Sequence, residues 1–338
     1  MRQNRRTWWQ RLRFELQCGL QQLCAQRPAM LAGKLLTRVS PGIAWALLRR
    51  RFEPQNWERR NGPARELASR AKPLVGIQQA ILWGLQTDGV VSLPLSRLVE
   101  DEAVAREARR AAIEALDRPK VNSQIERRWS SSGAKWYVVR GLGLGASRRL
   151  PDGLARLVLD RHLLGVVNGY LGVAARLHYV DAWHNFPVRA ADPAISAESW
   201  HRDHEDISVL KVAFMLDGVC PDSGPLFYVR GSQPGGPLAD LCPAFSSIGA
   251  RIRDAEVEAV IALGQVKVCT GAPGDLLLWD GVGLHHGGRA RRRDRRVVIA
   301  SYTSDVALGG CRYRASESVV HDLDESGRYA LRLAPSRR

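Results

Sequence analysis

The sequence has 338 residues, of which 45% are hydrophobic, so it can bury a substantial core and is not a disordered tail. Its formal net charge is +16, and its six cysteines are scattered without CxxC spacing. No apolar run is long enough to span a bilayer, and no signal peptide opens the chain, so we expect a cytoplasmic protein with free thiols.

The positive charge is concentrated in two segments. Residues 1–52 carry ten Arg and one Lys against one acidic residue, Glu15, and residues 289–296 hold six Arg and one Asp. The first segment combines Trp8, Trp9 and several Arg, as do helices that lie on anionic membranes, although such helices more often face their own domain. We therefore expect a basic amphipathic helical segment over 1–52, either packed on its own domain or in peripheral contact with a membrane. No nucleic-acid reader module accompanies the charge, so nucleic acid is not the favoured partner.

The segment 53–174 has a mainly helical pattern. Residues 96–117 predict the clearest helix, with Ser96 as its cap and acidic residues ahead of arginines. A second helix is predicted over about 153–172, where glycine ends it. We expect this region to pack against the part of the chain that follows.

From about residue 175 the pattern changes to short runs rich in Val, Leu, Phe and Tyr, bounded by Gly, Pro, Asp or Ser. Such spacing predicts a β-sandwich or barrel, here over 175–316, followed by a C-terminal tail over 317–338. The sequence PDSGP at 221–225 predicts a hairpin-type turn. The fold class is thus α+β, with helices packed on a β-rich core.

Alternation along the predicted strand 209–216 gives it two faces. Lys211, Ala213 and Met215 share the face that we expect to look into the barrel. Lys211 is the one charged residue of this run, so it is either a cation directed into the site or a lysine that extends to solvent at the strand edge.

Residues 199–210, SWHRDHEDISVL, contain two candidate pairs of metal ligands, His201 with Asp203 and His204 with Asp206. In each pair the two side chains lie on one side of an extended strand, because side chains alternate with period two. Two His and one carboxylate on one face of an iron leave positions open for oxygen and a cosubstrate. The distant ligand is expected in GDLLLWDGVGLHHGG at 274–288, which offers both His285 and His286. The residues alone leave these choices open.

An arginine cluster follows this segment. If the cosubstrate is 2-oxoglutarate, its far carboxylate requires a guanidinium, because the planar fork makes a bidentate pair. Arg295 and Arg296 lie at the entrance to the next predicted strand.

Residues 170–305 resemble the phytanoyl-CoA dioxygenase family of Fe(II)- and 2-oxoglutarate-dependent oxygenases. The resemblance rests on the order of four segments: WHRD at 200–203, LKVAFMLDGVCPDSGPLFYVRGS at 210–232, GDLLLWDGVGLHHGG at 274–288 and RRVVIASYT at 295–303. It implies a double-stranded β-helix core, the cupin-like jelly roll, and O2 as a second cosubstrate. RGSQ at 230–233 departs from the family's PGSH in a structural turn.

The resemblance also selects among the candidates. The first ligand of the family follows an aromatic or small polar residue, which favours His201 and Asp203 after Trp200. The family's arginine commonly lies eleven positions after the distal His, which favours His285 together with Arg296. The implied metal ligands are therefore His201, Asp203 and His285, and Arg296 is implied to bind 2-oxoglutarate.

Further cosubstrate contacts are expected from Lys211 and Tyr179. His184, near Tyr179, could rival the metal ligands, but we interpret it as an ordinary pocket or surface histidine.

The implied reaction hydroxylates an unactivated carbon of a small-molecule or lipid-like substrate and releases succinate and CO2. The carboxylate of Asp203 argues against halogenation, whereas desaturation, epoxidation and ring formation stay open. Two other functions also stay open: a basic membrane-surface or nucleic-acid-binding protein on a degenerate β-barrel scaffold, and a zinc-dependent hydrolase. Arg296 argues against the hydrolase, which has no need of it.

Overall fold

The computed structural model describes residues 50–118, 137–142, 147–188, 196–203, 205–241, 257, 263–307 and 309–334. The basic segment expected over 1–52 lies outside these residues, apart from a short 3-10 turn, η1, at Arg50–Phe52. Its contact with a membrane therefore stays a prediction. Within the residues described here, no helix is both long and apolar enough to cross a membrane.

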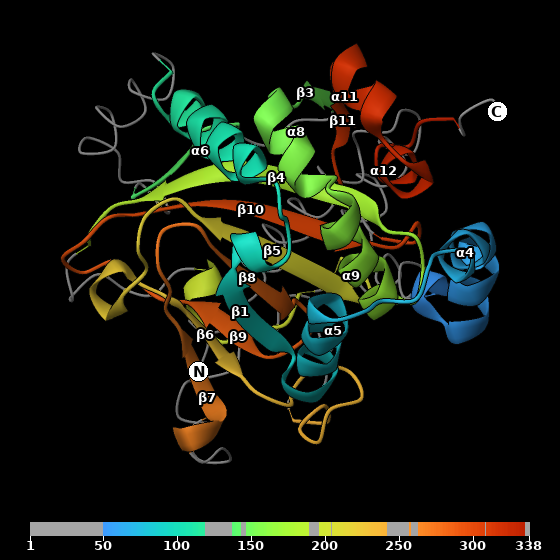
Figure 1. Cartoon of the computed structure of the whole chain (residues 1–338). Helices are drawn as coiled ribbons and strands as arrows, with labels where there is room; N and C mark the ends of the chain where they lie inside the picture. Colours follow the sequence, from blue (N-terminus) through green and yellow to red (C-terminus); the bar gives the residue numbers. More distant parts are fainter. Residues whose placement is uncertain are drawn as a thin grey trace, which may run out of the picture.

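Two antiparallel sheets form the β-core (Figure 1). Among the described residues, the larger sheet has the strand order β1-β8-β5-β10-β4-β2 and the smaller has the order β7-β6-β9. The larger sheet consists of β1 (Val90–Pro94), β2 (Val138–Arg140), β4 (Arg176–Asn185), β5 (Val209–Met215), β8 (Asp275–Asp280) and β10 (Arg295–Thr303). The smaller consists of β6 (Leu226–Val229), β7 (Val266–Cys269) and β9 (His285–Gly287). The jelly-roll core and the α+β class predicted from the sequence are confirmed.

The inner faces of the two sheets enclose an apolar cluster that includes Met215, Tyr228, Leu277 and Val297. On β5, the face predicted to look inward does so, because Ala213 and Met215 belong to this cluster and Lys211 shares their side of the strand. The alternate residues of β5 instead join the larger cluster under the helices. Alternate residues of β5 thus line the interior of the barrel.

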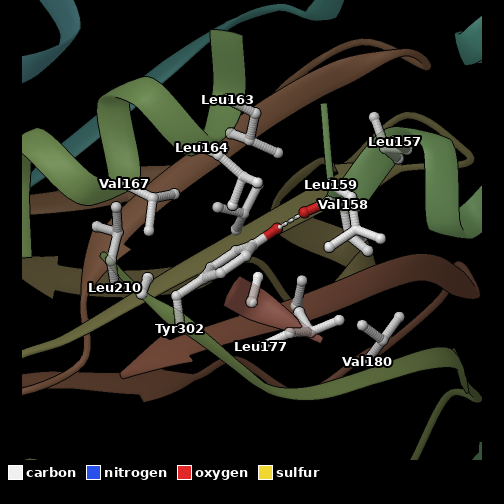
Figure 2. Close-up of a cluster of buried hydrophobic side chains, with 14 of the residues drawn as sticks. Leu157, Val158, Leu159, Leu163, Leu164, Val167, Leu177, Val180, Leu210 and Tyr302 are labelled. Carbon is white, nitrogen blue, oxygen red and sulfur yellow. Dashed lines mark hydrogen bonds between the residues drawn. The ribbon is translucent and has the colours of Figure 1, made fainter. Parts of the chain in front are cut away.

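Helices cover the outer face of the larger sheet (Figure 1). They are α4 (Pro54–Ser69), α5 (Ile77–Asp88), α6 (Glu102–Leu116), α8 (Asp152–Val158), α9 (Arg161–Leu171), α11 (Glu317–Asp322) and α12 (Glu325–Ala330). Figure 2 shows how α8 and α9 pack on β4, β5 and β10 around Tyr302, whose hydroxyl donates to the carbonyl of Val158 at 2.7 Å. Burial of this apolar layer holds the helices on the sheet.

Two helix boundaries differ from the sequence expectation. Helix α6 begins after Asp101, whose carboxylate accepts from the amide of Ala103 at 2.8 Å, whereas Ser96 lies in a separate 3-10 turn, η2, at Leu95–Arg97. The helix expected over 153–172 is two helices, because Asp160 caps a new one by accepting from the amides of His162 and Leu163. In both places a side chain that can bond the free amides of a first turn sets the helix start.

Strands occur in the region expected to be helical. Strand β1 pairs with β8, and β2 pairs with β4, so both extend the larger sheet. A short parallel pair, β3 (Ser147–Arg149) with β11 (Arg312–Arg314), lies apart from it. These strands are only three to five residues long, so tertiary pairing rather than local pattern decides them.

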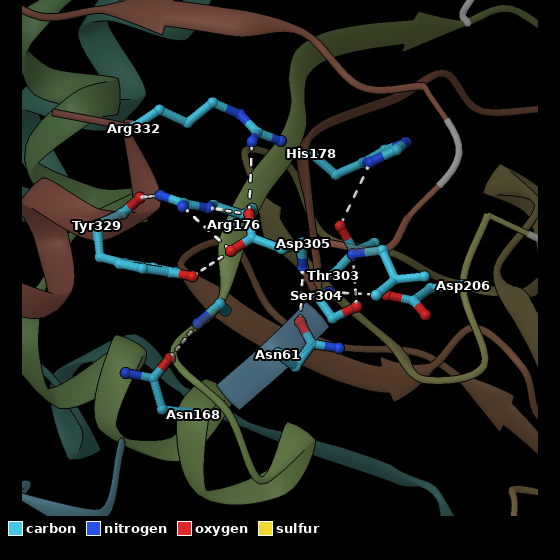
Figure 3. Close-up of polar contacts among 12 residues, drawn as sticks. Asn61, Asn168, Arg176, His178, Asp206, Thr303, Ser304, Asp305, Tyr329 and Arg332 are labelled. Carbon is cyan, nitrogen blue, oxygen red and sulfur yellow. Dashed lines mark hydrogen bonds and ion pairs between the residues drawn. The ribbon is translucent and has the colours of Figure 1, made fainter. Parts of the chain in front are cut away.

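The expected hairpin at 221–225 is wrong. This segment, with the 3-10 turn η4 at Pro221–Ser223, leads from β5 in the larger sheet to β6 in the smaller sheet. The C-terminal segment, expected as a tail, contains α11 and α12. It is bound to the core partly through Asp305, which pairs with Arg176 at 2.5 Å and accepts a hydrogen bond from Tyr329 (Figure 3).

Candidate metal centre

The three predicted metal ligands lie together where the two sheets meet. His201 and His285 form an isolated antiparallel bridge, in which each amide donates to the other's carbonyl at 3.0 Å. The amide of Asp203 donates to the carbonyl of Gly281 at 2.8 Å. Backbone bonds therefore hold the segment 201–203 beside the strand end that carries His285.

One ligand atom from each of His201, Asp203 and His285 lies within 4.8 Å of the others. Nε2 of His201 is 3.9 Å from Oδ1 of Asp203, and Nε2 of His285 is 3.7 Å from Oδ2. Asp203 is 8% exposed and His285 is 3% exposed. Oδ2 of Asp203 is buried and lies 2.5 Å from Nζ of Lys211, an ion pair that offsets part of the cost of burying the carboxylate.

Backbone contacts orient both imidazole rings. Nδ1 of His201 lies 2.8 Å from the carbonyl of Ser199, and Nδ1 of His285 lies 2.8 Å from the carbonyl of Gly283. A carbonyl can only accept, so each Nδ1 carries the proton and each Nε2 presents a lone pair toward Asp203. Two neutral imidazoles and one carboxylate are the donor set of a mononuclear non-haem iron site.

Burial keeps these histidines neutral. It is the main cause that lowers the pKa of His201 to about 3, with the neighbouring His285 adding to the effect. Burial, followed by the charge of Lys211, likewise lowers the pKa of His285 to about 3. At neutral pH both rings are therefore in the form that binds a metal.

Glycine at 281 leaves room for the carboxylate ligand. A Cβ at this position would lie 2.3 Å from Oδ2 of Asp203. The adjacent Asp280 accepts from the amides of Val282 and Gly283 and from the hydroxyl of Tyr170, so it shapes the turn that precedes His285.

Arg202, between the two proximal ligands, has a structural role that the sequence reading missed. Its guanidinium donates to four carbonyls, two of them at Ser232 and Val282 and two in the segment 239–241. It thereby joins the ligand segment to the loop after β6 and to the turn before His285. No local pattern signals this role, because the four carbonyls come from separate parts of the chain.

The rival ligands lie elsewhere or outside the described residues. His286 is stacked on Phe227, with ring centroids 4.7 Å apart, and contacts Trp200 edge-on. His184 is on the outer face of β4, paired with Asp294 at 2.7 Å. His204 lies outside the described residues.

Asp206, the rival carboxylate ligand, is fully buried under helix α4. It accepts from the indole of Trp57 at 3.1 Å and from the amide of Ser304 at 2.8 Å (Figure 3 shows Asp206 and Ser304). Its role is to join α4 to the end of β10.

The structure does not bring Arg296 to the metal cluster. Arg296 shares the outer side of β10 with Val298, and its Nε and Nη2 make a bidentate pair with Asp217 at 2.7 and 2.9 Å. Strand alternation places the preceding residue, Arg295, on the inner side with Val297. Spacing predicts Arg296 as the anchor, whereas the arginine on the inner side is Arg295. A shift of one residue along a strand moves a side chain to the opposite face.

Arg295 is held in place at the inner face. It donates through Nη1 to the carbonyl of Gly224. With the side-chain oxygen of Asn185 turned toward the guanidinium, Nη2 and Nε donate to that oxygen at 2.5 and 2.9 Å. Burial lowers the pKa of Arg295 to about 10, so it stays positively charged at neutral pH. These bonds use three of five donors and leave one on each terminal nitrogen, the fork that fits a carboxylate.

Lys211 and Tyr179, the other predicted cosubstrate contacts, both face the interior. Nζ of Lys211 is 2.5 Å from Oδ2 of Asp203, and it lies 5.9 Å from the centroid of the Tyr179 ring. Lys211 is 8% exposed. It is therefore a buried cation at the metal cluster and not a lysine that extends to solvent.

Three further inner side chains carry buried polar atoms without a hydrogen-bond partner: Nε1 of Trp183, Nε1 of Trp279 and Oγ of Ser301. None of the three belongs to a ligand motif in the sequence. Alternation along β4, β8 and β10 shows which residues share a side of each strand. Only the pairing of the strands shows which side faces the interior.

A cavity of about 550 Å³ lies among the outer helices, lined by residues that include Glu107, Arg156 and Asp322. None of the three candidate ligands lines it, so it is separate from the metal centre.

A jelly-roll core with a buried cluster of two histidines and one aspartate defines the class of mononuclear non-haem oxygenases. A family model, phytanoyl-CoA dioxygenase (PhyH), matches residues 85–298. The chain belongs to this family and is an Fe(II)- and 2-oxoglutarate-dependent oxygenase with O2 as cosubstrate. No curated protein matches it.

Several solved structures are similar to the chain. AviO1 from Streptomyces viridochromogenes Tue57 has 18% identity and a TM-score of 0.46, over 71% of this chain and 100% of that chain. EctD from S. alaskensis, solved with 2-oxoglutarate and 5-hydroxyectoine, has 17% identity and a TM-score of 0.48, over 73% and 91%. The non-haem α-ketoglutarate-dependent carbocyclase SnoK from nogalamycin biosynthesis has 17% identity and a TM-score of 0.46, over 70% and 85%.

Proposed function

We propose that this oxygenase hydroxylates an unactivated carbon of a small-molecule or lipid-like substrate, with Fe(II) bound by His201, Asp203 and His285. The observation that carries this proposal is the buried cluster itself, in which both Nε2 atoms and the carboxylate of Asp203 converge. Bound iron supplies oxygen activation coupled to the oxidative decarboxylation of 2-oxoglutarate to succinate and CO2. The chain supplies the ligands, their orientation and an anchor for the cosubstrate.

We assign that anchor to Arg295 in place of Arg296. Two donors of Arg295 are uncommitted and lie on the same inner face as Lys211, whereas the fork of Arg296 is occupied by Asp217 on the outer face. A bidentate pair between a guanidinium and the far carboxylate fixes both position and orientation of the cosubstrate.

The test is oxygen-dependent formation of succinate from 2-oxoglutarate by anaerobically purified protein reconstituted with Fe(II). Turnover uncoupled from substrate suffices, so the substrate need not be known. We expect succinate from the wild type and at least a hundredfold less from His201→Ala, Asp203→Ala and His285→Ala, whereas the control His286→Ala retains turnover.

Two results would contradict the proposal. Wild-type protein that binds neither Fe(II) nor 2-oxoglutarate would reject the enzyme assignment of this site. Loss of metal binding in His286→Ala but not in His285→Ala would show that the ligand register is different.

A further inference from the structure

We propose that the outer face of helix α5 (Ile77–Asp88) is the contact surface of a homodimer, in which two copies of the chain meet across a two-fold axis at Trp83. This inference concerns assembly and goes beyond the proposed reaction. It starts from the large apolar side chains that remain in solvent.

Three such side chains are exposed in the part of the chain that the structure describes: Val75, Trp83 and Val268. Trp83 lies on α5 and Val75 precedes the first turn of this helix, and each of the two is 68% exposed. Tryptophan buries more apolar surface than most residues when a partner covers it, so its exposure is costly. The two residues therefore mark α5 as a surface that a partner covers.

Helix α5 has an inner and an outer face. Ile81 and Leu85 form the inner face, with 2% and 0% exposure, and belong to the main apolar core. Successive residues of a helix are about 100° apart around its axis, so Trp83 projects away from that core. Gln79 and Gln86, one turn before and one turn after Trp83, are exposed as well.

Contacts on both flanks hold the helix in this orientation, beside β1 and α9 (Figure 1). Nε2 of Gln78 donates to the carbonyl of His162 on α9 at 2.9 Å. A Cβ at Gly84 would lie 2.7 Å from Cγ2 of Val91, so the helix backbone lies directly against β1. Trp83 cannot turn inward unless both contacts break.

Charge decides which partner fits the outer face. The chain has a net charge of +16 and 25% of its residues are charged, yet residues 73–87 contain no charged side chain. A contact across a two-fold axis brings residues near the axis close to their own copies, where like charges would repel. A neutral face is therefore where two copies of a basic chain can approach each other.

The polar residues of the face can pair with themselves. Gln79 and Gln86 each carry a carboxamide, whose oxygen accepts and whose nitrogen donates. A carboxamide can therefore bond to the same group of a second copy, which an ammonium or a carboxylate cannot do. Tryptophan is among the residues that contribute most to protein interfaces, so Trp83 is the expected anchor.

Other partners fit this face less well. Helices that bind anionic membranes carry Lys or Arg beside their apolar residues, and nucleic acids require cations too. On α5 and the segment that leads into it, the preceding cation is Lys72, outside the neutral stretch.

Analytical ultracentrifugation of the full-length protein at micromolar concentration tests the inference. We expect a dimer for the wild type and monomers for Trp83→Lys and Trp83→Glu. The dissociation constant should rise at least about 100-fold, because each substitution occurs twice in the interface. The control Val268→Lys, which changes an exposed apolar residue on β7, should leave the dimer intact.

A mixture of the two variants tests the symmetry of the contact. Equal amounts of Trp83→Lys and Trp83→Glu should form a mixed dimer, because opposite charges then meet across the axis. Variants that stay monomeric when mixed would show that residue 83 does not face its own copy.

Three further results overturn the inference. A wild type that is monomeric at these concentrations would show that the face does not join two copies. A dimer that persists in Trp83→Lys and Trp83→Glu would show that the copies meet elsewhere. A monomeric wild type that sediments with phosphatidylglycerol vesicles, while Trp83→Glu does not, would assign the face to a membrane.

Circular dichroism and thermal unfolding check the fold of each variant. If the substitutions at Trp83 prevent folding, Gln79→Lys and Gln79→Glu on the same exposed face carry the same comparison, alone and mixed.

Discussion

Arg295 and Arg296 are neighbours in the chain, but their side chains lie on opposite faces of β10. In the family the arginine commonly lies eleven positions after the distal histidine, and this spacing predicts Arg296. The prediction assumes that the loop after β9 has the usual length. The pairing of β10 with β4 and β5 places Arg295 on the inner face and is the basis for proposing it, because a strand that packs on both faces cannot shift by one residue.

The pair provides a matched test of the cosubstrate anchor. We expect Arg295→Met to weaken 2-oxoglutarate binding about 10- to 100-fold, since it removes a bidentate charged contact, and Arg296→Met to change it less than twofold. Calorimetry on the Mn(II)-loaded protein measures both. The reverse order would show that the family spacing, and not the strand register, identifies the anchor.

Gly281 provides a second test at the scale of one residue. In Gly281→Ala the new methyl group would lie 2.3 Å from Oδ2 of Asp203, so the carboxylate must move. We expect metal affinity to fall at least tenfold, while thermal unfolding shows that the protein still folds.

The control for this variant is Gly264→Ala, where a Cβ meets nothing within 4 Å. Equal metal affinity in Gly281→Ala and Gly264→Ala would mean that Asp203 is not held against the turn.

At the scale of elements, the later strands were predictable because each has its own apolar alternation and turn residues, as β5 and β10 show. Strands β1 and β2 were not, because they are short and lie among segments with a helical pattern, so only their pairing with β8 and β4 identifies them. The turn after β5 was misassigned because local residues predict a turn but not the sheet that the next strand joins.

Tyr302 links two elements through one buried bond, from its hydroxyl on β10 to the carbonyl of Val158 at the end of α8 (Figure 2). Tyr302→Phe keeps the packing of the ring and leaves this carbonyl without its partner. We expect the free energy of unfolding to fall by about 1 to 3 kcal/mol in urea titrations. A change below about 0.5 kcal/mol would indicate that the helix end satisfies the carbonyl in another way.

At the scale of the whole molecule, Asp305 connects parts far apart in the chain (Figure 3). It pairs with Arg176 at the start of β4, accepts from Tyr329 on α12, and its amide donates to Asn61 on α4. Burial alone would raise the pKa of Asp305, but the hydrogen bonds from Arg176 and Tyr329 outweigh it and lower the pKa.

A lowered carboxyl pKa makes part of the stability dependent on pH. Between this pKa and the ordinary value near 4, the unfolded chain binds more protons, so the stabilisation is present above pH 4 and is lost as the pH falls below it. We expect Asp305→Asn to lower the free energy of unfolding by about 1.5 to 3 kcal/mol at pH 7, with a smaller difference from wild type below pH 4.

Urea unfolding of both proteins from pH 7 to pH 3 measures this difference. Asp322→Asn, which breaks an exposed pair with Arg156, is the control and should have little effect. A difference between wild type and Asp305→Asn that stays constant over this range would contradict the assigned linkage.

Residue types and spacings in the chain predicted the β-rich C-terminal half, the family, and His201, Asp203 and His285 as candidate ligands. These features depend on residue type and short spacing, which the chain carries locally. Tertiary structure decided which side of a strand each residue occupies, and this is why we propose Arg295 in place of Arg296 as the anchor. It also brought Lys211, Ser301 and Trp279 into one row, because only strand pairing places residues from separate strands side by side.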